Sequence, residues 1–190
     1  MKFAIVSDIH GNLSALNFFI EYIEKEEINI ILNLGDTLAG EFPKEVFKKV
    51  FNDSRFINIK GNHENMFTAF DYELLGRDII LVLGKLPVKR IVKIEGISFL
   101  MVHSRENSNT DIPLLYNGGT INEFLADYKS TVDYVLMGHT HFPMMVGHYG
   151  EKTIINPGSL GLSYDRKACF CICEINEGDV TFSFKKLNIK

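Results

Sequence analysis

The sequence contains no tryptophan, few cysteines and prolines, and no long apolar run. Its 190 residues include 3 Cys and 5 Pro. No stretch approaches the roughly 18 apolar residues that a membrane-spanning helix needs, so we do not expect a membrane protein. Only four apolar residues follow Lys2 before Ser7, which is too few for a secretory signal peptide. We therefore expect a cytoplasmic protein.

The chain also lacks a block of basic residues. It carries 20 Lys and Arg against 24 Asp and Glu, a formal net charge of −4, and the two signs are interspersed. Long-range attraction of a polyanion needs a basic surface, so we expect no stable binding of nucleic acid.

The three cysteines are Cys169, Cys171 and Cys173. Alternation along a strand would place them on one face, where neighbours two residues apart are poorly placed for a disulfide. We interpret them as free thiols in a reducing compartment. Buried packing is the favoured role, because free cysteine is commonly buried, and metal binding by the three thiols is the alternative.

The length and composition indicate one globular domain, residues 1–190. Apolar residues make up 46% of the chain, enough for a sizeable core. In the first third, apolar runs that predict strands alternate with helical patterns. The predicted strands are 2–7, 28–34 and 56–59, and helices begin after Asn12, at Pro43 and at residue 63. This alternation is typical of a parallel sheet with helical crossovers.

The second half has a different pattern. It predicts a hairpin at 88–102, a loop at 104–119, a helix at 121–128, a strand at 132–137, paired strands at 144–148 and 153–155, and a last hairpin at 168–187. We expect parallel strands first and antiparallel strands later, in two packed sheets with helices outside. Two interpretations of the loop at 104–119 stay open: a surface connection, or a cover over the functional site.

Polar groups follow five of the predicted strands. The motifs are Asp8-Ile9-His10, Gly35-Asp36, Gly61-Asn62-His63-Glu64, Val102-His103 and Gly138-His139-Thr140-His141. They contain five of the six histidines in the sequence. Ligands of α/β sheets bind beyond the carboxyl ends of the strands, so we expect these motifs to meet there.

Seven of these side chains are candidate metal ligands: Asp8, His10, Asp36, Asn62, His103, His139 and His141. They are too many for one ion with open positions, so we expect two ions that share the two-oxygen carboxylate of Asp36. Imidazole and oxygen donors without thiolate favour Mn, Fe, Zn, Co or Ni, with Mn²⁺ as our first choice. Two such ions about 3.5–4 Å apart suit hydrolysis at phosphorus.

In order and position, these motifs resemble the calcineurin-like metallophosphoesterases, and most closely their small bacterial and archaeal phosphodiesterase branch. The resemblance extends from Asp8 to Ser159. It implies an α/β fold, a four-layer α/β/β/α sandwich of two mixed sheets. It also implies a phosphoesterase that cleaves phosphodiester bonds by a metal-bridging hydroxide, with phosphomonoesters left open. The substrate would be a small phosphate ester or a nucleotide.

The same resemblance implies a role for each residue. Asp8, His10, Asp36 and His141 would hold the first metal, and Asp36, Asn62, His103 and His139 the second. His63 would protonate the leaving oxygen as general acid, with Glu64 orienting its imidazole. Asn12, Asn62 and Ser159 would line the substrate site, and we add Arg105 of the long loop as a candidate phosphate ligand.

Some features depart from the family pattern. Ser104 follows His103 where Gly is usual, residues 162–166 read Leu-Ser-Tyr-Asp-Arg where Pro-Arg is usual, and His148 has no motif around it. The alternative function is a non-catalytic protein-binding scaffold, because the retromer complex uses such a fold as a scaffold subunit. Scaffolds tend to lose ligands or the acid, and this chain keeps both. A homodimer is the default expectation for assembly.

Overall fold

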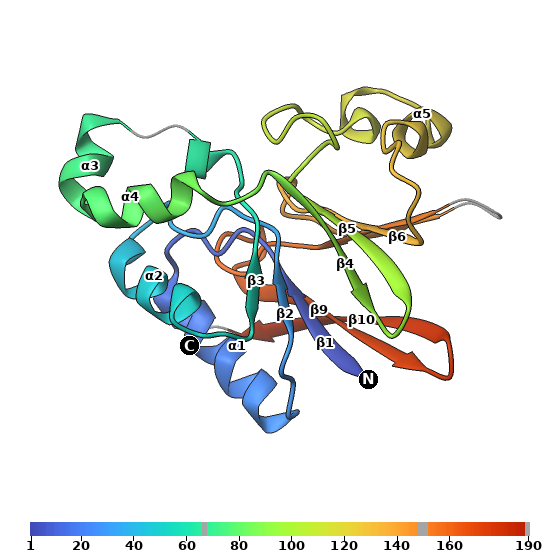
Figure 1. Cartoon of the computed structure of the whole chain (residues 1–190), viewed down its shortest axis with the longest axis horizontal. Helices are drawn as coiled ribbons and strands as arrows, with labels where there is room; N and C mark the ends of the chain where they lie inside the picture. The colour runs from blue at the N-terminus through green and yellow to red at the C-terminus, as the bar shows by residue number, and fades with distance from the viewer. Residues whose placement is uncertain (66–67, 148–151, 189–190) are drawn as a thin grey trace.

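The computed structural model describes residues 1–65, 68–147 and 152–188, and contains two mixed sheets of five strands each (Figure 1). The first sheet has the order β10 (Asp179–Asn188), β9 (Lys167–Asn176), β1 (Lys2–Val6), β2 (Ile31–Asn33), β3 (Phe56–Asn58). Here β1, β2 and β3 run parallel, while β9 is antiparallel to both of its neighbours. The predicted parallel start and final hairpin are confirmed.

The second sheet has the order β4 (Lys89–Ile94), β5 (Ile97–Val102), β6 (Tyr134–Leu136), β8 (Thr153–Pro157), β7 (Pro143–Val146). The outer pairs β4–β5 and β7–β8 are antiparallel, but β5, β6 and β8 run parallel. The expected antiparallel pairs are therefore present, and the sequence pattern did not indicate the parallel pairing of β5, β6 and β8 between them. The segment between β5 and β6 contains a helix and acts as a crossover, which returns the chain in the same direction.

Alternation along β1 shows why the sheets pack as they do. Phe3 and Ile5 belong to the core between the two sheets, whereas Ala4 and Val6 belong to a core beneath helices. Successive side chains of a strand point to opposite faces, so a strand that is apolar at every position must be covered on both sides.

Helices supply the two outer layers. Helices α1 (Leu13–Lys25) and α2 (Pro43–Phe51) lie against the first sheet, and α5 (Ile121–Ala126) lies on the far side of the second (Figure 1). Phe124 and Leu125 of α5 pack on Leu100 and Val135 of the second sheet. The result is the predicted four-layer α/β/β/α sandwich.

The predicted helix at 63–75 is interrupted. The chain forms a 3₁₀ turn, η1 (His63–Asn65), and then α3 (Ala69–Leu75), which a capping box between Thr68 and Asp71 begins. An unpredicted helix, α4 (Arg77–Gly84), follows Gly76. Within the described residues, none of the helices has the length and apolar character to cross a membrane.

The three cysteines are buried free thiols on β9, as predicted. Cys171 and Cys173 belong to the core between the sheets. Burial raises the pKa of each of these two thiols to about 12, so both stay protonated near neutral pH. Of the hairpin predicted at 144–155, β7 and β8 are present, while His148 and the predicted turn at 149–150 lie outside the described residues.

Candidate metal centre

The predicted ligands follow the carboxyl ends of five strands. Asp8, Asp36 and Asn62 come after β1, β2 and β3, and His103 and His139 come after β5 and β6. Because these strands run parallel within their sheets, the turns beyond them emerge at one edge. His10 and His141 lie two residues further along their loops.

The first group of ligand atoms comes from Asp8, His10 and His141, which lie within 4.8 Å of one another. Nε2 of His141 is 3.2 Å from Oδ1 of Asp8, and Nε2 of His10 is 3.7 Å from the same oxygen. The two Nε2 atoms are 3.1 Å apart. Three donor atoms thus converge on one point, as the ligands of a metal ion do.

The second group surrounds Asn62. Its Oδ1 lies 2.9 Å from Nε2 of His103 and 2.9 Å from Nδ1 of His139. Oδ2 of Asp36 lies 3.3 Å from Nε2 of His103. Asp36 also has an oxygen within 4.8 Å of ligand nitrogens of His10 and His63. Asp36 therefore connects the two groups.

These residues fit a pair of cations. Oδ1 of Asp8 is buried and has no hydrogen-bond partner among the described residues. A buried carboxylate oxygen without a partner is costly, and a bound cation would satisfy it. The donors are imidazole nitrogens, carboxylates and an amide oxygen, a set that suits divalent transition metals.

The shifted pKa values of Asp8, Asp36 and His103 also indicate that this site favours positive charge. Burial alone would raise the pKa of Asp8, but His141 and His103 lower it below its usual value. Burial likewise opposes ionisation of Asp36, and His103 holds the pKa of Asp36 low. Burial would lower the pKa of His103, yet Asp36 raises it to about 9. A bound metal ion would replace the proton that His103 holds at this raised pKa.

Backbone hydrogen bonds hold the ligands in place. Nδ1 of His103 donates to the carbonyl of Leu34 at 2.9 Å, which turns Nε2 toward Asp36 and Asn62. The backbone N–H of His139 donates to Oδ2 of Asp8 at 3.1 Å. In these two cases a backbone group of one loop positions a ligand of another.

Five of the ligands have an unusual backbone conformation. Positive φ angles occur at Asp8 (54°), His10 (47°), Asp36 (52°), His139 (67°) and His141 (61°). Non-glycine residues rarely adopt this region, and such strain concentrates at functional sites. The conformation aims side chains of adjacent turns at a common centre.

The glycines of the motifs let the loops approach one another. A Cβ atom on Gly61 would lie 2.1 Å from Oδ1 of Asp36, and a Cβ atom on Gly138 would lie 1.9 Å from Oγ of Ser7. Asn156, which was not among the predicted site residues, donates to the carbonyl of Gly138 at 2.7 Å. The signal in the sequence that could have pointed to Asn156 is its position in the run Asn156-Pro157-Gly158-Ser159, which ends at a predicted site residue.

His63 lies at the open side of the centre. Its side chain is 50% exposed, and its Nε2 is 3.9 Å from Oδ2 of Asp36. The ring is 5.3 Å from that of His10, centroid to centroid. A partly exposed imidazole beside the ligands can reach a substrate without being a buried ligand itself.

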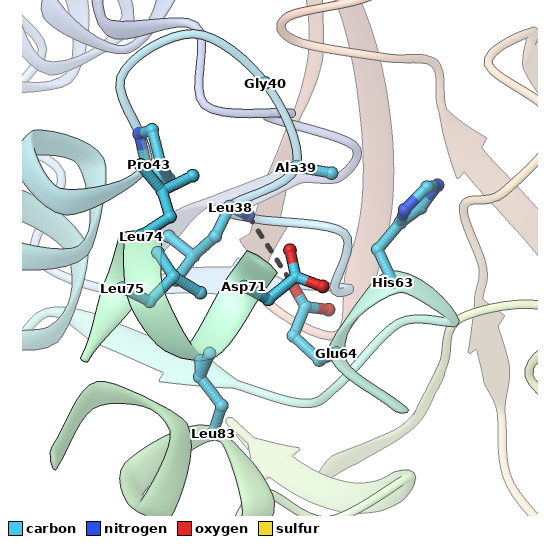
Figure 2. Close-up of a pocket in the computed structure, with 10 residues that line it drawn as sticks. All are labelled: Leu38, Ala39, Gly40, Pro43, His63, Glu64, Asp71, Leu74, Leu75 and Leu83. Atoms are coloured by element: carbon cyan, nitrogen blue, oxygen red, sulfur yellow. Dashed lines mark hydrogen bonds between the residues drawn. The ribbon is translucent and has the colours of Figure 1, made fainter. Parts of the chain in front are cut away.

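The predicted role of Glu64 needs correction. Its carboxylate is buried and accepts hydrogen bonds from the backbone N–H groups of Asp36, Thr37, Leu38 and Gly61. Figure 2 shows this carboxylate directed toward Leu38, on the other side from the His63 ring. Glu64 therefore fixes the backbone of the Asp36 loop rather than orienting the imidazole.

The other predicted substrate contacts have structural partners. Ser159 is fully buried, and its Oγ donates to the carbonyl of Asp8, so it cannot touch a substrate as we expected. Asn12 caps α1 and donates to the carbonyl of Gly161. Arg105 makes a two-nitrogen ion pair with Asp127 at 2.6 and 2.8 Å. Its contact with a phosphate stays a prediction that this pairing does not favour.

The loop at 104–119 is attached next to the centre, and its role as a cover over it stays a prediction. Asn109 donates to the carbonyl of Gly61 at 2.9 Å and accepts from Asn65 at 2.8 Å. Ser104, which departs from the family pattern, is buried and donates to the carbonyl of Asp111. The loop is thus closed on itself and attached beside Asn62.

Comparison with solved structures shows the same fold in several proteins. A metallophosphoesterase from Sphaerobacter thermophilus aligns with a TM-score of 0.74 and 20% identity, over 99% of this chain and 90% of that one. A protein described as a novel archaeal phosphodiesterase aligns with a TM-score of 0.64 and 20% identity, over 97% of this chain and 100% of that one. A Vps29 single mutant from Entamoeba histolytica aligns with a TM-score of 0.61 and 19% identity, over 99% of this chain and 100% of that one.

Sequence comparison gives the family. An uncharacterized protein of Methanocaldococcus jannaschii is 29% identical over 204 aligned positions, which cover 89% of this chain and 81% of that protein. Residues 1–178 match the calcineurin-like phosphoesterase superfamily domain. The chain belongs to the calcineurin-like phosphoesterase superfamily.

Proposed function

We propose that this protein is a dinuclear metal-dependent phosphoesterase that hydrolyses phosphodiester bonds. The observation that carries the proposal is the position of Asp36. It joins two groups of converging ligand atoms, and His63 stands partly exposed beside it. We also propose Mn²⁺ as the cation, in a reducing cytoplasm compatible with three buried free thiols.

Each residue of the chain has a task in this proposal. Bound cations would supply an activated water and neutralise charge on the phosphoryl oxygens. Asp36 would hold both cations, while the two groups around it set their spacing. His63 would give its proton to the leaving oxygen, because its ring lies at the open side where an ester would enter.

Two hollows next to the centre support a diester over a monoester. One, with a volume of about 270 Å³, is bordered by His63, and the other, of about 280 Å³, is bordered by His10. Ala39 and Gly40 line both. A phosphodiester carries two substituents, and each hollow could take one. The fold likeness to an archaeal phosphodiesterase agrees with this choice.

Hydrolysis of bis(4-nitrophenyl) phosphate and 4-nitrophenyl phosphate by Mn²⁺-loaded protein tests the proposal. We expect faster cleavage of the diester, abolished by chelation and by Asp36→Asn. For His63→Gln we expect a loss of about 10²–10⁴-fold, larger for esters of less acidic alcohols. If metal-loaded protein cleaves neither ester, or if cleavage survives chelation, the proposal fails.

A second candidate is a protein-binding scaffold. The rings of Tyr116, Phe142 and Tyr164 form an exposed stack, with Phe142 and Tyr164 at 4.5 Å and 11°. Exposed aromatic side chains are common at protein interfaces. The fold likeness to Vps29 also supports this candidate. The scaffold would be favoured if the purified protein bound no metal ion and formed a stable complex with another protein.

A further inference from the structure

A pocket of about 270 Å³ adjoins His63 on the side of α3 and α4 (Figure 2). Its described lining residues are Leu38, Ala39, Gly40, Pro43, His63, Glu64, Asp71, Leu74, Leu75 and Leu83. They come from the loop after β2, the start of α2, η1, α3 and α4. The sequence did not suggest this pocket, because segments distant in the chain build it.

The wall away from the metal centre is apolar. Leu75 and Leu83 are buried, and Leu74 is 37% exposed. Figure 2 shows the leucines of α3 and α4 on one side of the view and the His63 ring on the other. An apolar body held against the leucines would extend toward His63.

Apart from His63 at its rim, the ionisable groups of the pocket are the carboxylates of Glu64 and Asp71. Both oxygens of Glu64 already accept backbone N–H groups. Among the described residues, the Asp71 carboxylate accepts hydrogen bonds only through Oδ2, from the N–H and hydroxyl of Thr68, which leaves Oδ1 able to accept another. The described lining contains no Lys or Arg. A carboxylate or phosphate in this pocket would be repelled, whereas a hydrogen-bond donor would find Asp71.

We propose that this pocket binds the leaving alcohol of the substrate, and that this alcohol is uncharged, with an apolar body and a hydrogen-bond donor for Asp71. The inference rests on the proposed function, because it takes His63 as the acid. Water forms the new bond to phosphorus, and the bond from phosphorus to the ester oxygen breaks. That oxygen takes the proton of His63 and leaves as the alcohol into the pocket, while the proton of the water passes to solvent. Leaving groups that carry a second phosphate are disfavoured.

Aryl methyl phosphates with leaving phenols of similar acidity test the charge preference. One series member carries a neutral hydroxymethyl group and another a carboxylate. We expect kcat/KM for the neutral ester to exceed that for the anionic ester by about tenfold or more, because the Asp71 charge opposes the second. Asp71→Asn should bring the two values close together. An anionic ester cleaved as well as the neutral one by the native protein would overturn the proposal.

Binding of the free alcohol gives a readout that needs no turnover. With ¹³C-labelled leucine methyl groups, we expect 4-hydroxybenzyl alcohol to shift Leu38, Leu74 and Leu75, and 4-hydroxybenzoate to shift none of them. Leu74→Trp should abolish these shifts. Leu81→Trp is the matched control, because Leu81 is 52% exposed on α4 and is not among the lining residues.

Ester hydrolysis and the leucine methyl shifts together separate the proposed function from the assignment of this pocket. Methyl shifts without hydrolysis of any ester would sink the proposed function and the leaving-group role, while showing that the pocket takes an uncharged alcohol. Hydrolysis without methyl shifts, or shifts that survive Leu74→Trp, would overturn the pocket assignment and leave the phosphoesterase intact. Both the neutral preference and shifts confined to the lining leucines are required for the proposal to stand.

Discussion

The carboxylate of Glu64 holds the backbone of Asp36. Its Oε2 accepts the N–H of Asp36 at 2.9 Å and that of Gly61 at 2.7 Å, and its Oε1 accepts the N–H of Thr37 at 2.7 Å. One buried side chain thus ties the turn after β2 to the turn after β3. Asp36, with a φ of 52°, keeps its place between the two ligand groups because of this attachment.

Glu64→Ala should therefore destabilise the fold. It would leave several buried N–H groups without an acceptor, and each such group costs about 1–3 kcal/mol. We expect urea unfolding to show a loss of about 3 kcal/mol or more, together with weaker metal binding. His63→Gln is the contrast. Because the His63 side chain is half exposed, this substitution should change the free energy of unfolding by about 0.5 kcal/mol or less. Equal stability of Glu64→Ala and the native protein would contradict the assigned role.

Asp36→Asn should remove the metal-dependent part of the stability. A cation at about 100 times its dissociation constant stabilises the folded state by about 2.7 kcal/mol. We expect Mn²⁺ to raise the thermal unfolding midpoint of the native protein, and to raise that of Asp36→Asn much less. Asp78→Asn, an exposed change on α4, is the control. An unchanged Mn²⁺ response in Asp36→Asn would show that Asp36 does not join two cation sites.

The ligands could be predicted from the sequence because each is a polar residue where an apolar run ends. That signal is local, and it needs only the rule that strand ends of one sheet meet. The direction of Glu64 could not be predicted, since it depends on the approach of Gly61 to the turn that holds Gly35 and Asp36. The parallel pairing of β6 was missed because a strand of three residues carries little pattern.

Glu106 should make stability depend on pH in acid. Burial alone would raise its pKa, but bonds from Ser130 and Lys89 lower it from the usual 4.5 to about 2. A lowered carboxyl pKa stabilises the fold above pH 4.5, and this contribution is lost as pH falls toward 2. The shift corresponds to at most about 3 kcal/mol.

Glu106→Gln should therefore be less stable than the native protein in urea at pH 7. The difference should shrink between pH 4.5 and pH 2, as Glu106 becomes protonated first in the unfolded chain and then in the folded one. Glu73→Gln, at an exposed site on α3, should differ little from the native protein at any pH. A difference for Glu106→Gln that stayed constant down to pH 2 would mean that the charge of Glu106 contributes nothing.

Gly138→Ala should disrupt the metal centre. The added Cβ would lie 1.9 Å from Oγ of Ser7 and 2.7 Å from Oδ2 of Asp8, so the turns after β1 and β6 would have to separate. Oδ2 of Asp8 also accepts the N–H of His139, and separation would break that bond. By calorimetry we expect a loss of Mn²⁺ binding. We also expect the free energy of unfolding to fall by about 1–3 kcal/mol.

Gly84→Ala makes the same chemical change where there is room. Gly84 ends α4, and a Cβ atom there would meet nothing within 4 Å. Alanine favours a helix over glycine by about 0.5–1 kcal/mol, so this variant should keep its Mn²⁺ affinity and unfold at slightly higher urea. If Gly138→Ala bound Mn²⁺ as tightly as Gly84→Ala, the close approach of the two turns would not be what assembles the ligands.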